Sequence, residues 1–243
     1  MAEDSMESAS VDTSVKQGPL PGPGALLSQS WQLFKAHWLL FDWLILLPVI
    51  LLLALVGVML VVALTLGTEV FGSSTTSIAV LIIFSVPAVI VSFLTQIALV
   101  KAIQHEGAVG TKQLLRESWP LVWRFFLLNL LVALTMIVGF ILFVIPGIIF
   151  SVWFMFSIYI LVVEGTSGTA AMRRSKFYAR GKFWGLIGRA LVVILIAMIP
   201  SILVSAFENE TLAILLQLLS VFVISPVSAI YFFKLYQGAK ASS

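Results

Sequence analysis

The longest uncharged stretch of the sequence constrains the fold more than any other feature. It runs from Phe125 to Val163, which is 39 residues without Asp, Glu, Lys or Arg. As a single helix it would be about 58 Å long, roughly twice the ~30 Å hydrocarbon thickness of a bilayer. The alternative, one tilted helix with a proline kink, does not fit, because the usual range of tilts cannot absorb that difference. The stretch therefore predicts two membrane-spanning helices.

The predicted turn between these two helices is the pair Pro146 and Gly147. It divides the stretch into 125–145 and 146–163, which as helices measure about 31 Å and 27 Å. Proline disfavours helical geometry at the residue before it and suits the first turn of a following helix. Gly147 permits a tight backbone. We therefore expect a transmembrane hairpin that turns at Pro146 and Gly147.

The composition of the whole chain predicts the same environment. The sequence is 60% hydrophobic and 10% charged, whereas soluble domains carry about 25% charged residues. It has no cysteine, which excludes disulfides and thiolate catalysis. Four further apolar segments are long enough to span a bilayer: 41–66, 78–100, 184–207 and 212–233. The predicted fold class is all-α, a polytopic membrane protein with six transmembrane helices.

The distribution of positive charge predicts the orientation. Every Lys and Arg lies before the first span, in the second loop or its flanks, in the fourth loop or its flanks, or after the sixth span; Arg189, one to two turns inside the fifth span, is counted with the fourth loop's flanks. The positive-inside rule then places both termini in the cytoplasm and the protein in the cytoplasmic (inner) membrane. Residues 1–24, acidic and rich in Ser, Pro and Gly, are predicted to be a disordered cytoplasmic tail. Residues 25–238 would form the membrane domain, and 239–243 a second cytoplasmic tail.

A repeated pattern precedes the predicted hairpins. "LLSQSWQL" begins at Leu26 and "LLRESWPL" at Leu114, which matches Ser30 with Ser118 and Trp31 with Trp119. A third segment, from residue 171, matches more weakly through Ser175. Each segment mixes apolar and charged residues at helical spacing, which is typical of helices lying in the membrane interface. We expect three hairpins, each preceded by a cytoplasmic amphipathic interfacial helix; the alternative is chance similarity between Leu-rich segments.

The segment 139–185 resembles a known pattern. The matching residues are Ile145-Pro146-Gly147-Ile148, Glu164-Gly165, Ser167-Gly168, Ala171, Arg174 and Ser175. The pattern is similar to the membrane domain family of bacterial glycerophosphoryl diester phosphodiesterases and to the related YciC-like family of uncharacterised inner-membrane proteins. This resemblance implies a six-helix integral membrane protein of unsettled function. Because no soluble segment is long enough to hold the catalytic barrel of the larger relatives, their activity is not expected here.

Four polar residues near the cytoplasmic ends of the spans form the first candidate site. Asp42, Gln96, Asn129 and Arg189 should lie at similar depth. Because Trp184 and Lys182 place Arg189 near the cytoplasmic interface, we expect its charged end to extend to that interface. The alternative is that the four residues form a polar pocket for a lipid head group or an anion, with Asp42 paired to Arg189, since an ionisable residue inside a membrane commonly marks a functional site.

A basic cluster between the fourth and fifth spans forms the second candidate site. It consists of Arg173, Arg174, Lys176, Arg180 and Lys182. Clusters of this size next to a span bind anionic lipids, although they can also serve merely to set topology. Nucleic acid is not an expected partner for a short cluster held against a membrane.

The sequence contains no acid/base pair, nucleophile, cofactor motif or metal-ligand pattern. We therefore expect a non-catalytic protein without metal or cofactor: a membrane scaffold or a lipid-interacting envelope factor. Its expected partners are membrane lipids, anionic ones among them, and other membrane proteins. The alternative is a transporter or lipid translocator with a cavity between the hairpins. The Ser, Thr and Gly residues within the spans fit close helix packing, or they could line a polar path.

Overall fold

The computed structural model describes residues 20–66, 74–206 and 210–243, with side chains for 20–65, 85–205 and 211–243. Residues 1–19 of the predicted tail lie outside the described ranges. The described residues are almost entirely helical and contain no strand. In order, the elements are α1 (Pro23–Leu66), α2 (Ser74–Gln104), α3 (Thr111–Ser118), the 3₁₀ turn η2 (Trp119–Leu121), α4 (Val122–Leu142), α5 (Val144–Phe154), α6 (Ser157–Glu164), α7 (Gly168–Ala179), α8 (Phe183–Ala206), α9 (Glu210–Leu219), the π-helical turn η3 (Ser220–Ile224) and α10 (Ser225–Ala241).

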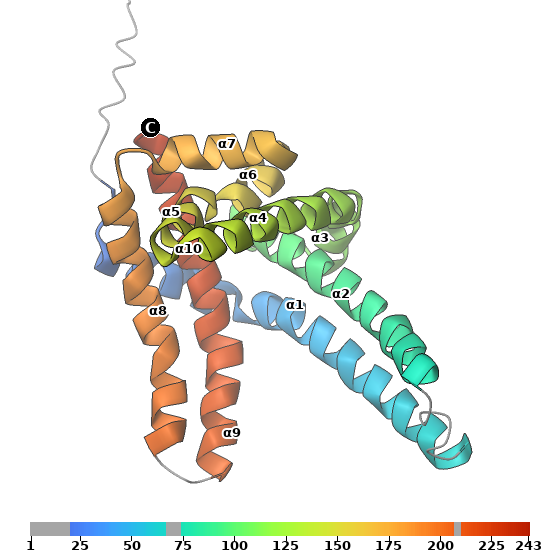
Figure 1. Ribbon diagram of the computed structural model, residues 1–243. Helices are drawn as coiled ribbons and strands as arrows, with labels where there is room; N and C mark the ends of the chain where they lie inside the picture. The colour runs from blue at the N-terminus through green and yellow to red at the C-terminus, as the bar shows by residue number, and fades with distance from the viewer. Residues whose placement is uncertain (1–19, 67–73, 207–209) are drawn as a thin grey trace, which may run out of the picture.

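Six helical stretches in the described part of the chain are long and apolar enough to cross a membrane. They are Pro23–Thr65, Ser85–Gln104, Thr111–Leu142, Val144–Glu164, Phe183–Ser205 and Thr211–Ala241. This confirms the predicted all-α class and the prediction of six apolar helices. Neighbouring stretches pack against each other as α1 with α2, α4 with α5, and α8 with α9. In Figure 1 the pairs α1–α2 and α8–α9 extend from one end of the molecule in different directions.

The break between α4 and α5 does not fall where the sequence predicted it. The extended residue is Phe143, with φ −169° and ψ 157°, and α5 already begins at Val144. Pro146 and Gly147 therefore lie in the first turn of α5 rather than in the connection, which corrects the predicted turn position. The physical reason is that the first backbone N–H groups of a helix have no intrahelical partner, so proline is tolerated throughout this turn.

Gly147 serves packing rather than backbone freedom. A Cβ atom at Gly147 would lie within 2.7 Å of three Phe140 ring atoms, and one at Gly139 would lie 2.7 Å from the Phe150 ring and 3.2 Å from the Cα of Gly147. The two glycines let α4 and α5 approach closely just beside the break. This is the small-residue contact that helices in a membrane commonly use.

A kink divides α1 into two parts. His37 has non-helical angles, φ −135° and ψ 30°, so a short helix from Pro23 to Ala36 precedes the apolar part. We call this short helix, α3 and α7 the lead-in helices. Gly107, in the α2–α3 connection, has φ +77°, and a Cβ there would clash with the His37 ring. The α2–α3 connection thus packs directly against the kink.

Each lead-in helix packs against a pair of apolar helices that is not its own. α3 packs on α2, and α7 packs on α5 and α6. The first lead-in has no pair before it, and it lies against the last one, because Leu27 and Trp31 share a groove with Val193 of α8 and Val227 of α10. The second and third lead-ins thus each lie against the helix pair before them, and the first lies against the last pair. We call this arrangement the closed packing of the lead-ins.

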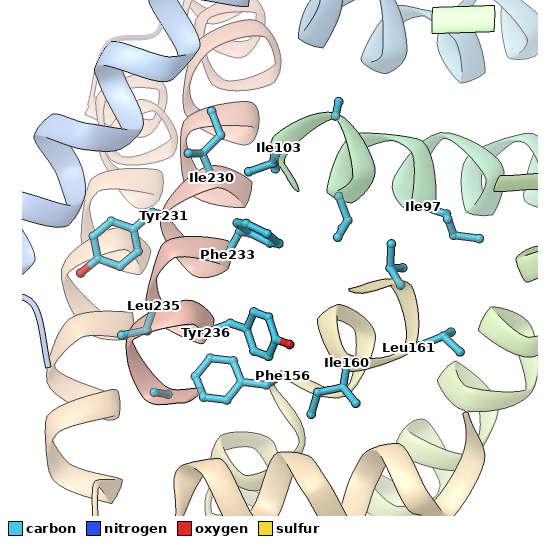
Figure 2. Close-up of a cluster of buried hydrophobic side chains, with 14 of the residues drawn as sticks. Ile97, Ile103, Phe156, Ile160, Leu161, Ile230, Tyr231, Phe233, Leu235 and Tyr236 are labelled. Carbon is cyan, nitrogen blue, oxygen red and sulfur yellow. The ribbon is translucent and has the colours of Figure 1, made fainter. Parts of the chain in front are cut away.

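The buried core lies at the end of the molecule that carries the lead-in helices. Figure 2 shows side chains of α2, α6 and α10 meeting there, among them Ile103, Ile160 and Tyr236. Tyr159 stacks on Tyr236 with ring centroids 5.7 Å apart. By contrast, the outer halves of the long helices expose large apolar side chains, for example Leu53, Ile141 and Ile202. A surface of this kind suits lipid rather than water.

The serines that the sequence matched between the lead-in segments share one property. Ser30, Ser118 and Ser175 are each 0% exposed. The residue four positions before each is also buried, so each lead-in turns the same face to the interior: Leu26, Leu114 and Ala171. The Ser30 and Ser118 hydroxyls donate to the carbonyls of Leu26 and Leu114, both at 2.7 Å. The Ser175 hydroxyl makes different bonds, described below.

Candidate functional site

The lead-in helix α7 divides its residues among three faces. The inward face is buried and consists of Ala171, Met172, Ser175 and Ala179. A flank carries Arg174 and Tyr178, whose polar ends both donate to Glu164 at the end of α6. The outward face carries Arg173 and Phe177, and Arg180, the residue that caps the end of α7, follows them; the three are spaced at i, i+4 and i+7 and are all exposed. We call this outward set the α7 stripe.

Ser175 joins α7 to a break in the helix beneath it. Its hydroxyl donates to the carbonyl of Trp153 at 2.6 Å and accepts from the N–H of Phe156 at 3.2 Å. These backbone groups lie where α5 ends and α6 begins, so they lack the partners that a continuous helix would give them. A single buried hydroxyl thus satisfies both orphaned groups and fixes α7 over the break.

Glu164, the last residue of α6, is the polar centre of the site. Its side chain is 8% exposed and accepts four hydrogen bonds. Oε2 accepts from Arg174 at 2.7 Å, and Oε1 accepts from Tyr236 at 2.7 Å, Lys240 at 2.9 Å and Tyr178 at 3.0 Å. The four donors come from α7 and α10, so one carboxylate ties three helices together. Gly165 ends α6 in the left-handed region, at φ 67°, which a helix-terminating glycine adopts readily.

The surroundings of Glu164 keep its donors in their donating forms. Burial, and after it the hydrogen bond to Glu164, raises the pKa of Tyr178 above its usual range. The phenol therefore stays protonated and donates at any physiological pH. The two cations that pair with Glu164 are half exposed, with side chains 54% accessible at Arg174 and 47% at Lys240. Their outer sides remain open to a second anionic partner.

An open cavity of about 620 Å³ lies over this network. Its walls hold three cations, one carboxylate and two aromatic rings, from Arg173, Arg174, Lys240, Glu164, Phe177 and Tyr178. Because the network already uses both oxygens of the carboxylate, the cavity presents excess positive charge. Such a cavity can bind an anion such as a phosphate ester beside an apolar ring.

The five residues of the predicted basic cluster divide into two groups. Three are already engaged within the molecule: Arg174 with Glu164, Lys176 over the Trp153 ring at 3.9 Å, and Lys182 as donor to the Ala239 carbonyl at 3.0 Å. Burial lowers the pKa of Lys182. The guanidinium groups of Arg173 and Arg180 have no ion-pair partner among the described residues. These two are the cations free to bind an external anion.

Arg189 does not pair with Asp42 in this structure. Its guanidinium donates to the carbonyls of Pro21 at 2.7 Å, Leu20 at 2.8 Å and Gly185 at 2.9 Å. It therefore holds the segment that leads into the first lead-in helix. Three main-chain acceptors satisfy the charge without a carboxylate, which the sequence could not show, because residues 20 and 21 lie far from Arg189 along the chain.

The other members of the predicted polar pocket also lie apart. One buried oxygen of Asp42 has no hydrogen-bond partner among the described residues. Asn129 donates within its own helix, to the Phe125 carbonyl at 2.9 Å. Gln96 lines a cavity of about 220 Å³ between α1, α2 and α10, whose walls include none of the other three predicted residues. The described contacts do not bring the four residues into one site.

Several residues of the site were missed from the sequence. Tyr178, Tyr236 and Lys240 were not among the candidates, although each donates to Glu164. The one available signal was Glu164 itself, an acidic residue at the end of an apolar span and shortly before a basic cluster.

The arrangement defines a general class, an all-helical protein with six helices long and apolar enough to cross a membrane in its described part, and with a cationic and aromatic site beside them. No family model, curated protein or solved structure matches the chain.

Proposed function

We propose that this chain is a non-catalytic integral membrane protein that binds anionic phospholipid head groups at the cytoplasmic face of the membrane. In this proposal the three helix pairs are transmembrane hairpins, both termini are cytoplasmic, and the lead-in helices lie in the cytoplasmic interface. The protein then serves as a lipid-interacting scaffold whose further partners are other membrane proteins.

The observation that carries the proposal is the α7 stripe. Its two arginines have no ion-pair partner in the part of the chain that the structure describes, while the neighbouring cations Arg174, Lys176 and Lys182 are engaged. Phe177 lies between the two arginines and is 60% exposed. An aromatic ring flanked by free cations suits the boundary between head groups and acyl chains, because the ring enters the apolar layer while the cations meet phosphates.

An exposed tryptophan near the α7 stripe supports the same proposal. Trp184 is the second residue of α8, the helix that comes after α7, and is 81% exposed. Tryptophan is enriched at the two interfaces of a membrane. The α7 stripe and Trp184 would therefore lie together at the depth where phospholipid phosphates are found.

The described cavities give less support to a polar transport path. Ser92 and Thr95, which line the cavity beside Gln96, donate to carbonyls of their own helix, those of Ala88 and Val91. Their hydroxyls thus behave as helix-packing groups rather than as a row of free ligands. The lipid-binding proposal accordingly takes precedence over the translocator.

The test is a head-group cross-linking experiment. The full-length protein is reconstituted in phosphatidylcholine discs that contain a minor fraction of phosphatidylglycerol carrying a photoreactive group near its phosphate. Adducts on the peptide that contains α7 are then measured by mass spectrometry. Each arginine contributes about 1 kcal/mol, so the double variant Arg173→Gln/Arg180→Gln should weaken binding at this site by about 30-fold.

The matched control removes the same charge from another lead-in helix. Lys112 and Arg116 are exposed on α3, and Lys112→Gln/Arg116→Gln should leave the α7 adducts unchanged. Equal adducts from a phosphatidylcholine probe, or full retention of the α7 adducts by the Arg173→Gln/Arg180→Gln protein, would overturn the proposal.

A further inference from the structure

A second groove, which is apolar, lies where the first lead-in helix meets α8 and α10. We call it the Trp31 groove. It has a volume of about 440 Å³, within the ~300–1,000 Å³ typical of small-molecule pockets. Its walls come from the lead-in (Leu27, Trp31), from α8 (Val193, Ile196) and from η3 and α10 (Val223, Val227).

The three hydroxyl groups in these walls already donate within the protein. Ser28 donates to the Ala25 carbonyl at 3.0 Å, Ser228 to the Ile224 carbonyl at 2.6 Å, and Tyr231 to the Arg189 carbonyl at 3.1 Å. The other side-chain donor in the wall is the indole N–H of Trp31, whose residue is 42% exposed at the edge of the groove. The groove therefore offers a hydrocarbon surface, and an apolar occupant fits it without leaving a buried polar group unpaired.

A local irregularity of the helix forms part of one wall. Val223 and Ile224 belong to η3, a π-helical turn between α9 and α10. Turns of this kind are rare and occur frequently at functional sites. This part of the wall is therefore formed by a π-helical turn and not by a regular α-helix.

A cation lies beside one lining residue of the groove. The Nζ atom of Lys35 is 5.8 Å from the centre of the Trp31 ring, and Lys35 is exposed. In the described residues Lys35 has no carboxylate partner. An occupant that is apolar along its length and negative at one end would complement both the groove and this cation.

The same feature occurs at the matched position of the second repeat. Trp119, the counterpart of Trp31, lines a groove of about 520 Å³ with Val89 and Phe93 of α2 and Trp123 of α4. At the corresponding position the third segment has Lys176, whose ammonium covers the Trp153 ring. Both units that carry tryptophan at this position, Trp31 and Trp119, have a groove beside it. The groove is therefore a repeated feature of these two units.

We propose that the Trp31 groove binds one acyl chain of an anionic phospholipid, with the phosphate held near Lys35. The residues of this chain outside the structure are a poor alternative occupant, because residues 1–19 carry four carboxylates and few apolar side chains. This site is distinct from the α7 stripe, and the inference stands even if the stripe binds no lipid.

The experiment uses a probe that reports on the acyl chain. The full-length protein is placed in phosphatidylcholine discs with phosphatidylglycerol bearing a diazirine within its acyl chain, and adducts are located by peptide mass spectrometry. Adducts are expected on α8, η3 and α10 at Val193, Ile196 and Val223–Val227, and excess unlabelled phosphatidylglycerol should compete with them. Ile196→Trp, which fills the groove, should reduce these adducts at least several-fold.

Two controls make the result specific. Leu195 is adjacent to Ile196 in sequence but is 55% exposed on another face of α8, so Leu195→Trp should leave the groove adducts unchanged. Lys35→Gln should lower the preference for phosphatidylglycerol over phosphatidylcholine by about 5-fold, which corresponds to about 1 kcal/mol for one cation. Arg173→Gln/Arg180→Gln should leave the groove adducts intact, which separates this proposal from the α7 stripe.

Two results would overturn the inference. The first is unchanged groove adducts in the Ile196→Trp protein. The second is equal labelling of the groove by phosphatidylcholine that carries the same diazirine. If Ile196→Trp does not fold, competition on the unmodified protein decides. If the groove is selective for anionic lipid, excess unlabelled phosphatidylglycerol must reduce the groove adducts, and the same excess of phosphatidylcholine must leave them unchanged.

Discussion

The first and third lead-in helices occupy matched positions in the repeat but are held in different ways. In the first, the Ser30 hydroxyl bonds within its own helix, and Trp31 borders an open groove. In the third, the Ser175 hydroxyl bonds across to the break between α5 and α6, and Lys176 covers the Trp153 ring. The third lead-in is therefore tied to its neighbours by polar contacts at positions where the first has none.

The difference shows how one packing plan can support two kinds of surface. Burial of the serine and of the residue four positions before it sets the orientation of both helices. The residue after the serine then decides whether the adjacent space is an apolar groove or a closed, cationic contact. The following predictions test this comparison.

The largest expected effect is at Glu164, the residue that ties the third lead-in to α6 and α10. Glu164→Gln keeps the size of the side chain but removes the charge that four donors share. Since hydrogen bonds to a charged group contribute about 1.5–3 kcal/mol, we expect the free energy of unfolding to fall by about 2–3 kcal/mol. Reversible unfolding in mixed detergent micelles measures this change.

The matched control for that variant is another ion-paired glutamate. Glu106 lies 3.7 Å from Lys234, but its side chain is 72% exposed. Glu106→Gln should change the free energy of unfolding by less than about 0.5 kcal/mol. Similar losses in the two variants would show that burial of the Glu164 network does not matter to stability.

Arg189 provides the polar tie next to the first lead-in, and its removal should have the next largest effect. Arg189→Gln loses charge-assisted bonds to the carbonyls of Leu20 and Pro21. We expect the start of this lead-in to be destabilised locally by about 2 kcal/mol, so that its amides exchange roughly 30-fold faster. Hydrogen exchange resolved by mass spectrometry over 22–30 measures this, and unchanged exchange would rule out the anchoring role.

The two serines distinguish the lead-ins most directly. Ser175→Ala leaves the Trp153 carbonyl and the Phe156 N–H without a partner, which should cost about 1–2 kcal/mol. Ser30→Ala removes a hydroxyl whose acceptor, the Leu26 carbonyl, lies inside a helix and keeps a backbone donor, so it should cost less than about 0.5 kcal/mol. Unfolding measured on both variants compares them, and equal costs would contradict the difference proposed between the first and third units.

The smallest expected difference concerns the two lysines over tryptophan rings. Lys176 lies 3.9 Å from the centre of the Trp153 ring, whereas Lys35 lies 5.8 Å from that of Trp31. Lys176→Gln should therefore cost about 0.5–1 kcal/mol of stability and Lys35→Gln less than that. The same unfolding assay applies, and a larger loss at Lys35 would reverse the comparison.

The apolar helices were predictable because the rule behind them is local. A helix must cross about 30 Å of hydrocarbon with its backbone hydrogen bonds satisfied internally, so hydropathy along the chain is enough to locate it. The break near Pro146 was less accessible, because proline fits any of the first turn's positions, and the sequence does not say which residue leaves the helix. The structure assigns that role to Phe143.

The polar contacts could not be predicted in the same way. Arg189 and its acceptors at Leu20 and Pro21 are far apart in sequence, as are Glu164 and Tyr236. Which partner a buried charge finds depends on how the lead-ins pack, and hydropathy does not encode that packing. The cluster around Arg173 was visible as a run of charges, but its division into engaged and free cations needed the positions of Glu164, Trp153 and Ala239.

The closed packing of the three lead-ins has a consequence for biosynthesis. The helix from Pro23 to Ala36 leaves the ribosome before α8, η3 and α10, yet these later elements form the other walls of its groove. Proteins are synthesised from the N-terminus, and their domains generally fold as they emerge. The first lead-in can therefore dock only after α8, η3 and α10 have been synthesised, so its groove is completed late in the assembly of the described helices.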